Sequence, residues 1–349
     1  GQKKPTLEYY KKQLLEEGVM TEQEIKEHHE WIWGLFEEAF KKAKSTESKD
    51  IEQWVASEWR DFKTTKELAT EILPHEPTNI TEATFKEVGT AVSSWPENFK
   101  VHKILQRILK AREKSITTGT QVDMATAEAL ALGSLAKEGF EIRVSGQDVE
   151  RGTFSQRHAV LHDQDNGSTY VPLQSLVQNK RKVTISNSHL SEYGVFGFEY
   201  GYSLHDPRSL IMWEAQFGDF ANTAQVISDQ FVAGGERKWN QRTGLVVSLP
   251  HGYDGQGPEH SSARIERYLQ LADEDSRVFP SEEKLNRQHQ DANMAVVYPT
   301  TPANLFHVLR RQMHREFRKP LILIWSKSLL RHPLARSNKE DFVEGKFFR

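Results

Sequence analysis

Residues 190–202 read Leu-Ser-Glu-Tyr-Gly-Val-Phe-Gly-Phe-Glu-Tyr-Gly-Tyr, an apolar helix-like segment with the acid Glu192 at its start. Short apolar segments flank it on both sides, at 182–185 and 210–213. Apolar strands that alternate with helices are typical of a mostly parallel sheet covered on both faces. This strand–helix–strand pattern is the part of the sequence that decides the fold.

Glu192 has two interpretations. First-turn glutamates are common because the helix dipole favours a negative charge there, and such a carboxylate would be exposed to water. Alternatively, Glu192 faces a heterocyclic nitrogen in a dry pocket, where desolvation raises its pKa until it can supply a proton at neutral pH. The glycines that follow, Gly194, Gly197 and Gly201, predict that the helix lies close to a neighbouring backbone or a flat ligand.

The same alternation continues over the rest of the chain after residue 122. Further strands are expected at 141–144, 245–249, 295–298 and 321–325. Helices are expected from Asp123 to Gly139, at 222–240, at 261–271 and from about Pro302. The sequence therefore predicts an α/β fold with three layers and a mostly parallel sheet.

Polar, glycine-rich strings follow three of the expected strands, at 145–148, 214–220 and 250–262. Ligand sites in parallel sheets lie at the carboxyl ends of strands, so this clustering predicts a site there. In the loop 145–160, Asp148, Arg151 and His158 fit a functional loop and a solvated turn equally well.

Four further residues in these strings are candidates for the site. Phe217 and Phe220 fit core packing, and they also fit an aromatic wall stacked on a flat ligand. His260 fits a structural histidine; at the start of the helix expected from Ser261, it also fits an anion-binding group helped by free backbone N–H groups. His251 is a weaker candidate of the same kind.

The sequence pattern of residues 1–118 predicts helices, and this part of the chain is highly charged. The capping box Thr21-Glu22-Gln23-Glu24 predicts a helix start. That helix is expected to turn an aromatic and apolar stripe toward a core, made of Trp31, Trp33, Leu35, Phe36 and Phe40. Between residues 64 and 98, prolines break the pattern, which predicts connecting segments.

Composition excludes several classes of protein and site. The 46 basic and 49 acidic residues give a net charge of -3, which argues against a generally basic nucleic-acid surface. The chain has no cysteine, so disulfides, thiolate nucleophiles and Cys-ligated metals are excluded. No apolar run approaches the length of a membrane span, and neither a metal-binding motif nor a readable targeting signal is found. A hydrolase using His251 or His260 would lack a nucleophile elbow.

Four strings together carry a family resemblance: 190–202, Trp-Glu-Ala-Gln-Phe-Gly-Asp-Phe at 213–220, Leu-Pro-His-Gly-Tyr-Asp-Gly at 249–255, and Gly-Pro-Glu-His-Ser-Ser at 257–262. From about residue 122 to residue 336 the chain resembles the E1 component of the 2-oxoglutarate dehydrogenase complex. The resemblance implies the thiamine diphosphate pyrimidine-binding fold, preceded by a helical connecting region.

The resemblance also implies roles for individual residues. Glu192 is expected to hydrogen-bond N1′ of the aminopyrimidine of thiamine diphosphate and so to promote deprotonation of the thiazolium. At least one of Phe217 and Phe220 is expected to stack on the pyrimidine. His260 is expected to be catalytic and to contact substrate, with Ser261 and His251 as further substrate-binding residues.

Family members hold the diphosphate and Mg²⁺ on another domain, through a Gly-Asp-Gly triplet and a later Asn that this sequence lacks. The resemblance thus divides the chain into a helical connecting region (1–118), a transketolase-like pyrimidine-binding domain (119–336) and the start of a truncated C-terminal region (337–349). Alone, the chain is expected to be inactive.

The implied function is oxidative decarboxylation of 2-oxoglutarate with succinyl transfer to the lipoyl group of an E2 partner, by a homodimer in the mitochondrial matrix. Nucleic acid is not an expected partner, and no membrane span is expected. Two alternatives stay open: a 2-oxoadipate dehydrogenase E1, and a non-catalytic module for interaction or dimerisation. Binding of thiamine diphosphate would separate the last of these from the others.

Overall fold

The chain forms two compact units, Gly1–Ala56 and Ser57–Arg349. The computed structural model describes residues 3–45, 59, 62–63, 67, 76–177, 181–254, 257–273, 281 and 292–344. Among these residues, no helix combines the length and apolar character needed to cross a bilayer.

The first unit contains helices α1 (Thr6–Glu16) and α2 (Glu22–Ser45). The predicted capping box is confirmed: Thr21 N donates to Glu24 Oε2 at 2.8 Å, and Glu24 N donates to Thr21 Oγ1 at 3.3 Å. The prediction that the aromatic stripe of α2 enters a core is wrong for this unit, since neither helix buries any residue. In the described part of this unit, α1 and α2 offer no layer that encloses the stripe.

The second unit is built on a six-stranded parallel sheet. Every strand expected from the sequence is present, which confirms the α/β class. The spatial order is β4 (Val183–Asn187), β1 (Glu141–Gly146), β5 (Ser209–Glu214), β6 (Val246–His251), β8 (Leu321–Ser326) and β7 (Ala295–Val297).

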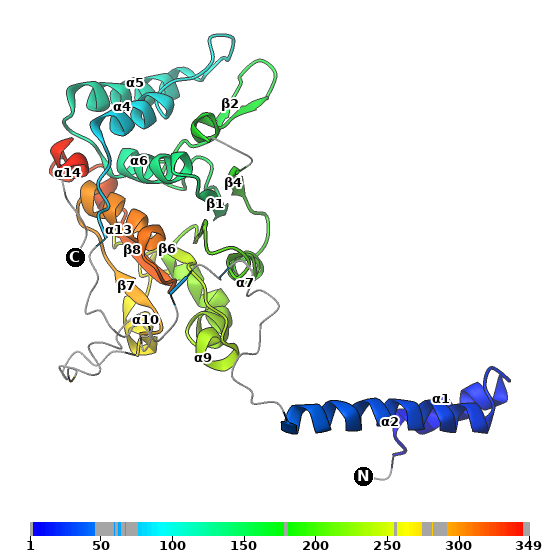
Figure 1. Cartoon of the computed structure of the whole chain (residues 1–349). Helices are drawn as coiled ribbons and strands as arrows, with labels where there is room; N and C mark the ends of the chain where they lie inside the picture. The colour runs from blue at the N-terminus through cyan, green and yellow to red at the C-terminus, as the bar shows by residue number, and fades with distance from the viewer. Residues whose placement is uncertain are drawn as a thin grey trace. The chain divides into compact units, whose positions relative to one another are not determined.

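Helices cover both faces of this sheet and make three layers (Figure 1). Alternate residues of a strand face opposite layers, so Leu210 and Met212 join one core while Ile211 and Trp213 join the other. The first core is closed by α6 (Met124–Lys137) and α13 (Pro302–His314). The second is closed by α7 (Glu192–Ser203) and the segment 218–233.

Helices α4 (Glu82–Ala91) and α5 (Lys103–Thr118) add to the first face, where α4 packs against α6. The expectation of only connecting segments between 64 and 98 therefore missed α4. The packing is tight because a Cβ on Gly133 would meet Val88 Cγ1 at 2.4 Å. Smaller elements complete the unit: the hairpin of β2 (Leu161–His162) and β3 (Thr169–Tyr170), the 3₁₀ turns η2 (Pro172–Leu176) and η6 (Ser328–Leu330), and α14 (Glu340–Val343).

Two helices expected from the sequence differ in the structure. The single helix expected at 222–240 is replaced by η3 (Gly218–Ala224), α8 (Gln225–Ile227), the π-turn η4 (Ser228–Val232) and α9 (Gly235–Trp239). Gly234 and Gly235 interrupt it, and Tyr200 fills the space beside Gly235, where an added Cβ would lie 2.2 Å from Tyr200 Oη.

The helix expected from Ser261 begins later than predicted. It is α10 (Ile265–Leu271), preceded by the 3₁₀ turn η5 (Pro258–His260). Arg264 adopts the left-handed conformation with φ of 54°, so the chain turns sharply before α10 and Ser261 cannot belong to that helix.

Candidate functional site

Glu192 is the first residue of α7, and its carboxyl group is buried with only 4% of the residue exposed. Ser191 caps the helix by accepting a hydrogen bond from Gly194 N at 3.4 Å. Glu192 Oε1 accepts a hydrogen bond from Gln216 N at 3.2 Å, whereas Oε2 has no hydrogen-bond partner among the described residues. The interpretation of Glu192 as a solvent-exposed helix-start residue is therefore wrong.

Burial raises the pKa of Glu192 to about 7, against smaller opposing effects of the Gln216 N–H group and the Trp213 indole. The indole Nε1 of Trp213 is itself buried and makes no hydrogen bond within the described part of the chain. Its ring stacks on Phe196 of α7, with centroids 4.1 Å apart and planes 13° apart. The carboxyl group thus sits beside an aromatic wall and can exchange a proton near neutral pH.

Phe217 and Phe220 lie just beyond the end of β5 and are only partly buried. Their rings contact each other edge to face at 5.6 Å, and His260 contacts both, at 4.3 Å from Phe217 and 5.3 Å from Phe220. Gln216, whose backbone N–H donates to Glu192 Oε1, directly precedes Phe217 in the chain. The structure therefore brings three predicted site residues, Phe217, Phe220 and His260, into contact with one another just beyond the end of β5.

The turn Gly257–Ser261 carries His260 and Ser261. His260 Nδ1 lies 3.0 Å from Glu259 Oε1. The prediction that His260 sits at the start of a helix is wrong, because it ends η5 and α10 begins only at Ile265. Ser261 is buried, and its hydroxyl donates to Gly257 O at 2.9 Å.

His251 ends β6 and lies among different aromatic residues. Its ring contacts Tyr253 at 5.9 Å and Tyr298 at 6.3 Å. Nδ1 accepts a hydrogen bond from Ala263 N at 3.0 Å, so in the neutral ring the proton is on Nε2. Thus His251 supports the turn that precedes α10.

The loop that follows β1 is held in an unusual backbone conformation. Asp148, Ser155 and His158 all have positive φ, between 48° and 57°. Asp148 accepts a hydrogen bond at 2.8 Å from the side-chain Nε2 of Gln216, the residue whose backbone N–H supports Glu192. His158 is buried, and burial lowers its pKa, which favours the neutral ring. Arg151 bonds only to backbone carbonyls of its own loop within the described residues.

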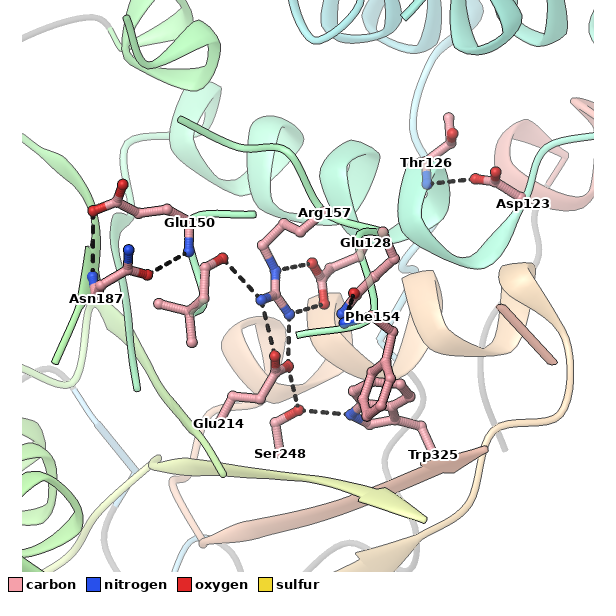
Figure 2. Close-up of polar contacts among 12 residues, drawn as sticks. Asp123, Thr126, Glu128, Glu150, Phe154, Arg157, Asn187, Glu214, Ser248 and Trp325 are labelled. Atoms are coloured by element: carbon pink, nitrogen blue, oxygen red, sulfur yellow. Dashed lines mark hydrogen bonds and ion pairs between the residues drawn. The ribbon is translucent and has the colours of Figure 1, made fainter. Parts of the chain in front are cut away.

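A buried arginine that sequence reasoning missed fixes this loop. Arg157 donates to both oxygens of Glu128 on α6, at 2.6 and 3.0 Å, and to both oxygens of Glu214 at the end of β5, at 2.9 and 2.6 Å (Figure 2). It also donates to Val149 O at 3.1 Å. Burial alone would lower the pKa of Arg157, but the two carboxylates raise it well above its usual value.

The network extends from Glu214 across the ends of the neighbouring strands. Ser248 of β6 donates to Glu214 Oε2 at 3.0 Å, and Trp325 Nε1 of β8 donates to Ser248 Oγ at 2.8 Å (Figure 2). Phe154 of the loop lies edge-on to Trp325 at 6.0 Å and to Phe217 at 5.4 Å. The ion pairs of Arg157 therefore position an aromatic side chain of the loop against the predicted site.

Two glycines are required where the strands end. A Cβ on Gly146 would lie 2.1 Å from Glu214 O, and one on Gly218 would lie 2.4 Å from Pro250 O. Within α7, a Cβ on Gly197 would lie 3.3 Å from a side-chain atom, Ile227 Cδ1, whereas nothing lies within 4 Å of one on Gly201 and the nearest neighbours of Gly194 belong to its own helix start. Among the described residues, the expected neighbouring backbone is therefore not found at Gly197 or Gly201, and the expectation of a flat ligand stays a prediction.

The outer face of α7 is exposed and aromatic, formed by Leu190, Tyr193, Phe198 and Tyr202. Arg143 of β1 lies over the rings of Phe198, at 5.4 Å, and Tyr202, at 4.9 Å. Its guanidinium is fixed by buried Glu199 of the same helix through two hydrogen bonds of 2.7 Å. We call these four exposed residues the α7 face.

Comparison with known proteins shows strong similarity to one group of enzymes. A protein named 2-oxoglutarate dehydrogenase, mitochondrial, from Saccharomyces cerevisiae is 65% identical over 347 residues, which are 99% of this chain and 34% of that protein. The protein of the same name from Schizosaccharomyces pombe is 56% identical over 345 residues, which are 99% of this chain and 34% of that protein. The 2-oxoglutarate dehydrogenase E1 component of Brucella canis is 49% identical over 348 residues, 99% of this chain and 33% of that protein.

This chain spans about a third of the length of these relatives. Residues 120–333 match the family described as "Transketolase, pyrimidine binding domain". That range contains the whole parallel sheet, Glu192 and the aromatic residues around His260. With the match covering more than half of its length, the chain belongs to the transketolase pyrimidine-binding-domain family.

Proposed function

We propose that this chain is the pyrimidine-binding part of a thiamine diphosphate-dependent 2-oxoglutarate dehydrogenase E1 component. The observation that carries the proposal is Glu192, a buried carboxyl group at the sheet edge whose Oε2 has no hydrogen-bond partner among the residues that the structure describes. A buried polar atom without a partner is costly unless a ligand satisfies it. An aminopyrimidine nitrogen is a polar acceptor that suits this atom. With a pKa of about 7, Glu192 can carry the proton that it donates to such a nitrogen near neutral pH.

Each predicted site residue has a place in this proposal. Bound thiamine diphosphate supplies carbanion chemistry that no amino-acid side chain provides. Glu192 holds and exchanges the proton at the ring nitrogen, and Phe217 and Phe220 offer their rings to the flat heterocycle. His260 contacts substrate beside these rings, with Ser261 and His251 as supporting groups. Ser261 would accept a hydrogen bond through Oγ, because its hydroxyl proton is already donated to Gly257 O.

The diphosphate and Mg²⁺ belong, in this proposal, to a domain outside the chain. The one Gly-Asp pair, Gly218-Asp219, lacks the following Gly of the family triplet. Asp219 is buried and already engaged with Arg264 Nε at 2.9 Å. We therefore keep the division into a connecting region (1–118), a pyrimidine-binding domain (119–336) and the start of a C-terminal region (337–349), and expect the chain alone to be inactive.

The partners follow from the same assignment. We propose a homodimer in which the α7 face packs on a second copy, because its exposed side chains are apolar and aromatic and Gly201 leaves space beside the helix. A lipoyl-bearing E2 succinyltransferase would accept the succinyl group. The mitochondrial names of the fungal relatives favour the mitochondrial matrix as the location.

The experiment compares the full-length protein that carries this chain with its Glu192→Gln variant. Titration calorimetry with thiamine diphosphate and Mg²⁺ and a 2-oxoglutarate decarboxylation assay are run on both. We expect binding to weaken and kcat to fall by about 10²- to 10⁴-fold, the range for loss of a positioned acid–base group. A variant as active as the wild type would disprove the role of Glu192.

The runner-up is a non-catalytic module kept for dimerisation or complex assembly, which the exposed α7 face also suits. In that case the full-length protein would bind no thiamine diphosphate, yet it would still dimerise. A 2-oxoadipate dehydrogenase would bind the cofactor normally but give the higher kcat/KM with the six-carbon substrate. The same two assays, with 2-oxoadipate as a second substrate and the oligomeric state measured in parallel, thus separate all three functions.

A further inference from the structure

Lys327 directly follows β8, and its ammonium group lies among the predicted site residues. The residue is only 6% exposed. Its Nζ donates to His260 O at 2.8 Å and lies 5.7 Å from the ring centre of Phe217 and 5.9 Å from that of Phe154. Phe217 therefore contacts both Lys327 and His260, and it follows Gln216, the residue that holds Glu192.

This ammonium has no anionic partner in the described part of the chain. None of the ion pairs found there within 4.0 Å includes Lys327. Exposed Asp254 interacts with the Lys327 ammonium only at longer range, and burial lowers the pKa of Lys327. Among the described residues its side chain makes one hydrogen bond, to His260 O, which uses one of its three N–H donors.

Such a group differs from Arg157, the buried cation that fixes the loop after β1. Arg157 has two carboxylates, so its charge is neutralised within the chain. A buried cation without a counter-ion costs stability, and a ligand that supplies the opposite charge would offset this cost. The rings of Phe154 and Phe217 flank the ammonium and limit access of water, which strengthens any ion pair formed there.

We propose that Lys327 binds a carboxylate of the substrate, and specifically the carboxylate remote from the oxo group of a dicarboxylic 2-oxo acid. This inference rests on the proposed function. The carboxylate next to the oxo group leaves as carbon dioxide, so an ion pair with it would stabilise the ground state and oppose the reaction. The remote carboxylate keeps its charge throughout and benefits from a fixed ammonium.

The test uses the full-length protein, with Lys327→Met and Lys327→Arg compared against Lys110→Met, an exposed lysine on α5. KM and kcat are measured for 2-oxoglutarate and for 2-oxovalerate, which has the same five carbons but no remote carboxylate. Half-saturation by thiamine diphosphate is measured in parallel.

For Lys327→Met, KM for 2-oxoglutarate should rise by about 10- to 100-fold, the effect of losing a hydrogen bond to a charged group. KM for 2-oxovalerate and cofactor half-saturation should not change. Lys327→Arg should restore part of the affinity for the dicarboxylate, and Lys110→Met should match the wild type.

Three results would overturn the inference. An equal rise in KM for both substrates would mean that Lys327 only holds the turn that carries His260 in place. A specific rise in the thiamine diphosphate requirement would mean that the anion is the cofactor diphosphate. Unchanged KM for 2-oxoglutarate would mean that Lys327 contacts no substrate. If the wild type itself fails to use 2-oxo acids, the proposed function falls first and this inference falls with it.

Discussion

Replacing Arg157 by Met should destabilise the second unit severely. The methionine keeps most of the side-chain volume but removes the charge, so Glu214 and Glu128 lose four hydrogen bonds from a guanidinium that is itself 4% exposed. Breaking one side of a buried ion pair typically costs about 3–5 kcal/mol, because a buried charge is left uncompensated. That is a large part of the stability of an ordinary domain.

Urea unfolding of the 349-residue chain at pH 7, followed by tryptophan fluorescence, measures this loss. Lys100→Met is the matched control, since Lys100 and Asp165 form a 2.6 Å pair in which both side chains are well exposed. That change should cost less than about 1 kcal/mol. The double variant Arg157→Met/Glu214→Gln should recover part of the loss. Equal effects of Arg157→Met and Lys100→Met would refute the assignment of Arg157 as the centre of a buried network.

Three further perturbations follow from the structure. Burial raises the pKa of Glu192 from 4.5 to about 7, so the free energy of unfolding of the wild type should fall by up to about 3 kcal/mol as pH rises from 5 to 8. Urea unfolding at both pH values measures this loss, and Glu192→Gln should abolish it. Gly218→Ala should lower stability by about 1–3 kcal/mol, measured as a lower Tm, because its Cβ would clash with Pro250 O; Gly201→Ala, in open space, should not lower Tm. Phe198→Glu should convert the proposed homodimer to monomer in analytical ultracentrifugation, whereas an unchanged mass would place the dimer contact elsewhere.

The strands of the sheet were predictable because their signal is local. Residues 245–247 and 321–325 are continuous apolar runs, which are typical of strands buried on both faces. Glu192 was found through its position at a helix start, but sequence alone left its exposure open. The burial of Glu192 depends on Trp213 and Gln216, which lie on and just after the next strand, β5.

The parts that were missed depend on distant partners. Arg157 looks like any loop arginine in the sequence, since its carboxylates are 29 and 57 residues away. Lys327 likewise follows an ordinary buried strand, and its neighbours His260 and Phe154 come from separate loops. The prediction of a single helix at 222–240 was wrong in part because Gly235 makes room for Tyr200 of α7, a contact between separate elements.

The attachment of the loop that follows β1 has a consequence for its motion. Since Arg157 ties the loop to α6 and β5 at once, the loop cannot open without breaking buried ion pairs on two elements. It therefore behaves as part of the same cooperative unit as the sheet rather than as a flap, and its amide protons should exchange with solvent only when that unit unfolds.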